Sequence, residues 1–120
     1  MLRALLAALN FKMTYNIELS GRIKHINNAG TKEHGYRILD KARMLTTING
    51  IQRTGCYQLL GTEEVLMGES TDCRVNFCIE TENFEKEVSK LPVEFEIYVV
   101  NELVAVGGLT KIESITNIEI

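Results

Sequence analysis

The chain has 120 residues, of which 45% are hydrophobic and 24% charged, with a formal net charge of −3. This composition is typical of one soluble globular domain with a single core. With one proline and nine glycines it is neither Pro-rich nor of low complexity, and it has no apolar run of the roughly 18 residues that a membrane-spanning helix needs. Its three cysteines, an odd number, favour free thiols in a reducing compartment, so we expect a cytoplasmic protein with no membrane association.

The two halves of the chain carry opposite charge. Residues 1–60 contain nine Lys/Arg and three Asp/Glu, whereas residues 61–120 contain four and thirteen. Such asymmetry can indicate a polyelectrolyte-binding face. Because no stretch has more than two adjacent like charges, we favour another interpretation, in which strands from the two halves lie side by side and pair their charges across a sheet.

The first residues differ in composition from the rest. Residues 1–12 read MLRALLAALNFK, and their leucines recur at helical spacing, without a cleavage site of the kind that ends a secretory signal. The segment predicts a short amphipathic helix that plugs one end of the domain, or an interaction tail. Alternatively, Met13 is the true start and the preceding residues are upstream sequence. We therefore assign residues 1–13 to an N-terminal extension, helical or not native to the domain, and residues 14–120 to the domain itself.

From Tyr15 onward, apolar and polar residues alternate with a period of two, which predicts β-strands. Asn49-Gly50 is typical of a tight hairpin turn, and Gly107-Gly108 predicts a bulge or bend inside the last strand. We expect residues 61–72 to form a polar loop. The expected strands are 15–23, a segment within 37–47 whose periodicity also allows a helix, 51–60, 73–79, 93–99 and 103–112.

This spacing of short strands predicts an all-β domain, a closed or nearly closed antiparallel β-barrel. The alternation also predicts which side chains point inward. We expect the interior to contain Ile17, Leu19, Val75, Phe77, Phe95, Ile97 and Val106.

The last two strands resemble a known family. Residues 93–97 (VEFEI) and 104–112 (VAVGGLTKI) are similar to the final hairpin of elongation factor Tu, in which a Leu-x-Phe-x-Ile strand is followed by Val-Gly-x-Gly-x-Val-Thr-Lys-Ile. Weaker matches precede it in the same order: the opening strand at 15–23, Gly-Tyr-Arg at 35–37, and Met-Gly-Glu at 67–69 where the family has Pro-Gly-Asp. The resemblance implies a six-stranded antiparallel β-barrel of the type that ends elongation factor Tu.

The resemblance covers residues 14–113 and also has two departures. The barrel that forms the third domain in this family helps to grip aminoacyl-tRNA, and part of its Arg-Glu-Gly-Gly segment contacts the tRNA. Here Tyr98-Val99-Val100-Asn101 takes that place, and Ile38-Leu39 replaces the Pro-Gln that follows Gly-Tyr-Arg. Both departures put tRNA binding in doubt and leave the barrel intact.

The sequence contains no motif for catalysis or for a cofactor. It has neither a Gly-x-x-x-x-Gly-Lys-Ser/Thr loop nor Asn-Lys-x-Asp, so we expect no binding or hydrolysis of GTP. Cys73 and Cys78 lie an odd number of residues apart, which places them on opposite faces of a strand and excludes a zinc knuckle. Glu94 and Glu96 are expected on a solvated face rather than as an acid–base pair. We therefore expect a non-enzymatic protein without metal, cofactor or small-molecule substrate.

One candidate binding site is a basic loop that contains Lys32, His34, Tyr36 and Arg37. Such a loop can hold phosphate and stack a base, which points to RNA as the ligand. An ordinary solvated loop, with the tyrosine folded onto the barrel, fits the same residues.

The second candidate is an apolar patch of Tyr98, Val100 and Leu103, where a polar strand face is expected. Two interpretations of this patch remain open: contact with a protein partner, and coverage by a helix of residues 1–9. The sequence therefore predicts a non-catalytic protein-binding module, such as an adaptor, a regulator or an immunity-type protein. The alternative is a translation-associated factor that binds tRNA or ribosomal RNA.

Overall fold

The structure of the protein, a computed structural model, describes residues 14–27, 37–80 and 91–118. These residues contain eight β-strands and no helix, and hence no helix that could cross a membrane. The predicted N-terminal helical extension lies outside the described residues. The strands are β1 (Thr14–His25), β2 (Ile38–Leu39), β3 (Arg43–Ile48), β4 (Ile51–Leu60), β5 (Glu64–Val65), β6 (Ser70–Glu80), β7 (Val93–Val99) and β8 (Glu102–Ile118).

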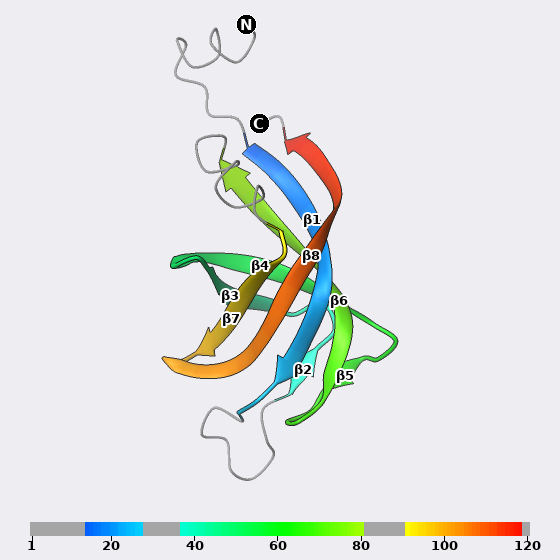
Figure 1. The fold of residues 1–120 in the computed structure, drawn as a ribbon, viewed down its shortest axis with the longest axis vertical. Coiled ribbons are helices and arrows are strands. Elements are labelled where there is room, and N and C mark those ends of the chain that lie inside the picture. The colour runs from blue at the N-terminus through cyan, green and yellow to red at the C-terminus, as the bar shows by residue number, and fades with distance from the viewer. Residues whose placement is uncertain (1–13, 28–36, 81–90, 119–120) are drawn as a thin grey trace, which may run out of the picture.

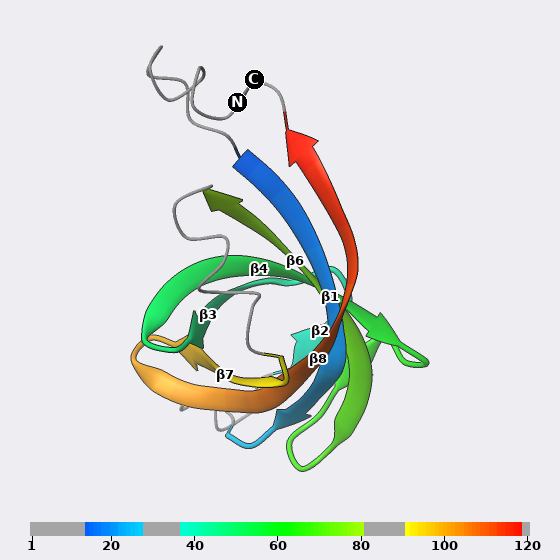
Figure 2. The same ribbon diagram turned by 45° about the horizontal axis from the view of Figure 1, so that its top comes forward.

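Six of these strands close into an antiparallel barrel in the order β1-β6-β4-β3-β7-β8, and β2 pairs with β5 in a separate small sheet (Figure 1). The last strand closes the ring against the first, since β8 pairs with β1 along almost its whole length. Figure 2 shows how β8 curls around the barrel to reach both β7 and β1. The expected all-β, six-stranded antiparallel barrel is confirmed.

The interior follows the predicted alternation, with one exception. Six of the seven predicted interior residues are buried, but Val106 is only half-buried. The cause is a β-bulge: Ile97 pairs with Ala105 and Tyr98 with Leu103, so Val104 has no partner on β7. The extra residue lets Val104 and Ala105 both point inward and turns Val106 outward.

The turn at Asn49-Gly50 is as predicted, because both residues have positive φ, 51° and 79°, and β3 and β4 pair directly on either side. Residues 37–47 form the short strand β2 and most of β3, not a helix. The expected polar loop 61–72 is wrong in part, since it contains β5 and the start of β6. Val65 is buried opposite Ile38, and this pairing forms β5. The sequence pattern did not predict it because the two paired segments are distant in the chain.

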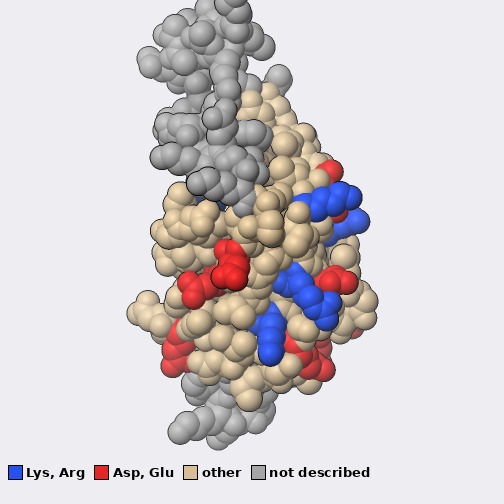
Figure 3. Space-filling view, viewed as in Figure 1, with Lys and Arg blue, Asp and Glu red and all other residues tan. Residues whose placement is uncertain are grey.

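Ion pairs join the two oppositely charged halves of the sequence across neighbouring strands. Arg22 on β1 pairs with Asp72 on β6 at 2.8 Å, and Glu18 on β1 pairs with Arg74 on β6 at 3.8 Å. The face drawn in Figure 3 accordingly shows basic and acidic side chains close together, without a broad area of one sign. The Arg22–Asp72 pair joins a base of the first half to an acid of the second, as the asymmetry predicts, whereas the Glu18–Arg74 pair has the opposite arrangement.

Candidate functional site

The turn between β7 and β8 is the most unusual feature of the described surface. Val100 and Asn101 form it with φ of 49° and 65°, the geometry of a two-residue hairpin turn that glycine and asparagine normally occupy. A β-branched residue is disfavoured at positive φ, because its side chain crowds the backbone. Val100 is also 89% exposed. The turn therefore presents an apolar side chain to solvent at a cost in backbone energy.

The other two members of the predicted patch lie beside this turn. Tyr98 and Leu103 are directly paired across β7 and β8, and both are half-buried. Partial desolvation raises the pKa of Tyr98 above its ordinary value, and the charge of Glu96 and a hydrogen bond with its carboxylate add to the effect. The structure thus brings Tyr98, Val100 and Leu103 together at one hairpin end, which we call the hairpin patch. Residues 1–9, the alternative cover for this patch, lie outside the described residues.

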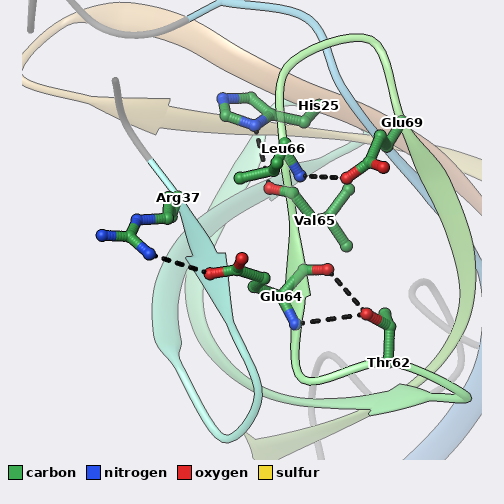
Figure 4. A network of polar contacts seen from close by, with 7 residues as sticks. All are labelled: His25, Arg37, Thr62, Glu64, Val65, Leu66 and Glu69. Atoms are coloured by element: carbon green, nitrogen blue, oxygen red, sulfur yellow. Dashed lines mark hydrogen bonds and ion pairs between the residues drawn. The ribbon is translucent and has the colours of Figure 1, made fainter. Parts of the chain in front are cut away.

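Of the predicted basic loop, only Arg37 lies within the described residues. Its guanidinium is exposed and donates to the Glu64 carboxylate at 3.2 Å (Figure 4). This contact lies at the β2–β5 sheet. The Glu64 carboxylate neutralises part of the positive charge with which Arg37 would attract an RNA phosphate. Lys32, His34 and Tyr36 lie outside the described residues.

His25 is completely buried at the end of β1. Its Nδ1 lies 3.0 Å from the carbonyl oxygen of Val65, and its Nε2 lies 2.8 Å from that of Asn27. The backbone extends the link, since the His25 amide donates to Glu69 and the His25 carbonyl accepts from Gly68. Figure 4 shows the imidazole above the strand of Val65, where it connects β1 to the small β2–β5 sheet.

The three thiols lie in different surroundings. Cys73 is buried and Cys78 exposed, as their spacing predicts for opposite faces of β6, and Cys56 on β4 is intermediate. Burial raises the pKa of the Cys73 thiol to about 12, and the charge of Asp72 adds to the shift. Among the described residues, no group of three metal-ligating side chains comes together.

A groove of about 870 Å³ follows the junction of β3 and β7, where only Thr46 and Thr47 pair with the opposite strand. Glu94 and Glu96 both line it, the first exposed and the second half-buried, and we call it the acidic groove. The Thr47 hydroxyl is buried there without a hydrogen-bond partner among the described residues. The described part of its lining includes neither histidine nor cysteine.

A second groove was not foreseen from the sequence. It has a volume of about 480 Å³ and lies over β1, β6, β4 and β3. No short motif predicts it, because its residues come from four separate strands that only the folded barrel brings together. We call it the basic groove. It is lined by Asn16, Arg43, Gln52, Arg53, Thr54, Cys56, Asn76 and Cys78.

The barrel thus offers an exposed apolar hairpin patch, an acidic groove and a basic groove. No protein-family model matches the chain, and no curated protein matches it significantly in sequence.

Proposed function

We propose that this protein is a non-catalytic protein-binding module that docks to a protein partner through the hairpin patch of Tyr98, Val100 and Leu103. The observation that carries the proposal is Val100, 89% exposed in a left-handed turn conformation. Asparagine or glycine at this position would form the turn with less backbone strain, so the exposed valine does not stabilise the fold. Burial of this side chain against a partner stabilises the complex by roughly 25 cal/mol per Å² of apolar surface removed from water.

The chemistry around the patch favours protein over RNA. No Lys or Arg occurs from Val93 to Glu102, whereas Glu94, Glu96 and Glu102 lie on the two strands that carry the turn. RNA binding depends on cations that converge on phosphates, and carboxylates repel them. Tyr98 is an amphipathic residue of the type enriched at the centres of protein interfaces.

The resemblance to the last barrel of elongation factor Tu supports a module of this kind, because in that family the barrel acts by contacting other macromolecules. The closed, six-stranded antiparallel barrel agrees with it. Kinship with that family, and a role in translation, belong to the proposal. Translation-associated RNA binding is the alternative, and the only described residue of the basic loop that favours it is the exposed Arg37.

The test is affinity capture of the tagged full chain from a lysate of its source cells, with and without nuclease, comparing four proteins. They are the wild type, Val100→Asp, Arg37→Ala, and Leu39→Asp as a matched control. Leu39 is also an exposed apolar residue, on the separate β2–β5 sheet. We expect one protein partner that persists after nuclease and at about 0.5 M salt, where electrostatic contacts are screened.

Val100→Asp should reduce capture of this partner about tenfold or more, because a charge would be buried in an apolar contact. The Leu39 and Arg37 variants should bind like the wild type. If capture depends on RNA, and Arg37→Ala abolishes it while Val100→Asp does not, the RNA-binding alternative replaces the proposal.

A further inference from the structure

The basic groove forms where β4 and β6 separate on the outside of the barrel. Their pairing ends at Cys56 and Asn76, although β4 begins at Ile51 and β6 runs on to Glu80. Meanwhile β6 remains paired with β1 as far as Thr14. The separation opens a depression of about 480 Å³, within the size range of small-molecule sites.

Two arginines give the groove its positive charge. Arg53 is half-buried, and its Nη1 donates to the carbonyl oxygen of Cys78 at 3.4 Å, across the gap between β4 and β6. Arg43 enters from β3, where it is paired with Cys56. Among the described residues, no Asp or Glu lines the groove. The described lining therefore contains two arginines and no carboxylate, on a chain whose net charge is −3.

Arg43 differs from other described arginines in its surroundings. Arg22, Arg37 and Arg74 each form an ion pair with a carboxylate, at 2.8, 3.2 and 3.8 Å. Arg43 is exposed and forms no ion pair with a described residue. Its guanidinium is thus available to an anion, and this group matches the geometry of phosphate with two parallel hydrogen bonds.

The neutral side chains of the groove indicate what accompanies the phosphate. Asn16, Gln52, Thr54 and Asn76 supply three carboxamides and a hydroxyl, which donate to and accept from sugar hydroxyls. Asn16 and Asn76 are already held together, since Nδ2 of Asn16 donates to Oδ1 of Asn76 at 3.2 Å. The described part of the lining contains no aromatic residue, so it offers a nucleobase no ring on which to stack.

We propose that the basic groove binds a phosphorylated sugar, with Arg43 and Arg53 on the phosphate and the carboxamides on the sugar hydroxyls. The same chemistry has two sources: a free sugar phosphate, and the ribose-phosphate backbone of RNA. The groove lies on β1, β6, β4 and β3, whereas the hairpin patch lies on β7 and β8. The two proposals therefore rest on different residues and fail independently.

Calorimetric titration of the full chain tests the site with ribose 5-phosphate, ribose and an eight-residue oligouridylate. We expect saturable binding of a phosphorylated probe and, at the same concentrations, none of ribose. Arg43→Gln should weaken binding about tenfold to a hundredfold, because it removes a charge-assisted bidentate contact. The control is Arg22→Gln, which removes an exposed arginine outside the groove and should change affinity less than about twofold.

Thiol alkylation locates the ligand independently of any substitution. Cys78 is exposed and Cys56 half-buried, and both line the groove, whereas Cys73 is buried. A saturating phosphorylated probe should slow the reaction of Cys78 with N-ethylmaleimide severalfold, and ribose should not. This measurement needs only the wild-type chain, so it remains decisive if a variant fails to fold.

Binding of ribose 5-phosphate that Arg43→Gln weakens supports a free sugar phosphate as the ligand. Binding of the oligouridylate alone, weakened by the same substitution, supports the RNA backbone as the source. The proposal is overturned if neither probe binds at millimolar concentration, if Arg22→Gln weakens binding as much as Arg43→Gln, or if the bound probe leaves Cys78 alkylation unchanged.

Discussion

Two glycines show how closely the backbone approaches itself in this barrel. A Cβ atom on Gly21 would lie 1.9 Å from the carbonyl oxygen of Gly108, and one on Gly107 would lie 2.2 Å from that of Arg22. The Gly107 position also faces the ring of Phe95, at 2.3 Å. These distances exclude any side chain. The sequence predicted a bulge or bend at Gly107-Gly108. The pairing is regular at these two residues, and the neighbouring bulges lie at Val104 and between Ser20 and Gly21.

We therefore expect Gly21→Ala to lower the free energy of unfolding by more than about 2 kcal/mol, since β1 and β8 would have to move apart. Gly108→Ala is the matched control, because its Cβ would meet nothing closer than 3.7 Å. This control should change stability by less than about 1 kcal/mol. Urea unfolding followed by circular dichroism measures both, and equal losses would contradict the close-approach argument.

At Val100 we expect a substitution to raise the free energy of unfolding. Val100→Asn should stabilise the chain by about 1 kcal/mol, because asparagine tolerates the left-handed conformation that valine adopts with strain. The control is Ile115→Asn, at an exposed position on β8 without positive φ, where no gain is expected. If thermal unfolding finds Val100→Asn no more stable than the wild type, the turn is not strained.

The raised pKa of the Cys73 thiol predicts how the stability of the fold depends on pH. Its folded pKa of about 12 lies above the ordinary value of 9.0, so above pH 9 the unfolded chain ionises while the folded chain does not. Its contribution to stability is therefore complete below about pH 9 and is lost as pH rises towards 12, by at most about 1.4 kcal/mol per pH unit. Tyr57, whose pKa burial also raises, adds to the loss above its ordinary value of 10.0.

The measurement is the urea midpoint between pH 7 and 10.5 for the wild type and Cys73→Ala. The variant should be less stable at pH 7, because it loses a buried side chain, but its stability should fall less steeply above pH 9. Parallel pH profiles for the two proteins would show that Cys73 does not titrate on unfolding.

At the scale of elements, the junctions between neighbouring barrel strands differ in how many residues they pair. β1 and β6 pair continuously from Thr14–Glu80 to Lys24–Ser70, whereas β3 and β7 pair only at Thr46–Ile97 and Thr47–Glu96. The acidic groove occupies the junction where this short ladder ends. The β3–β7 junction is therefore the weakest closure among the barrel strands, because few backbone hydrogen bonds hold it.

We expect native-state hydrogen exchange to detect opening at this junction first. Amides of Thr47 and Glu96 should exchange at least about tenfold faster than those of Leu19 and Val75, which lie in the long β1–β6 ladder. Equal protection at the two junctions would mean that the barrel opens only as a whole.

The whole molecule depends on contacts between distant parts of the chain. β1 pairs with both β6 and β8, so the first described strand closes the ring. Residues 1–12 precede this strand, and the alternating pattern is complete without them. Closure of the barrel should therefore depend on β1 itself.

Two truncations test this dependence. A chain that starts at Met13 should melt within about 3 °C of the full chain, because the pairing of β1 is unchanged. A chain that starts at Ser20 should lose cooperative unfolding, since Ile17 and Leu19 leave the core and β6 and β8 lose half of their partner. A large loss of stability in the first truncation would indicate that residues 1–12 cover part of the barrel.

The sequence by itself determined the features that depend on local geometry. Alternation with a period of two identified six interior residues, Asn49-Gly50 identified a hairpin, and the spacing of Cys73 and Cys78 placed them on opposite faces. It also singled out the hairpin patch, because apolar residues stood where polar ones were expected. These inferences succeed because strand period and turn conformation are properties of neighbouring residues.

Only the tertiary structure decided the strand order, the bulge at Val104, the pairing of β2 with β5 and the convergence of Arg43 and Arg53 on one groove. Each depends on which distant strands meet and in which register. A shift of one residue reverses every side chain beyond it, as Val106 illustrates. The register is set by packing of the whole core and by close backbone contacts such as Gly21 on Gly108, and no local pattern encodes it.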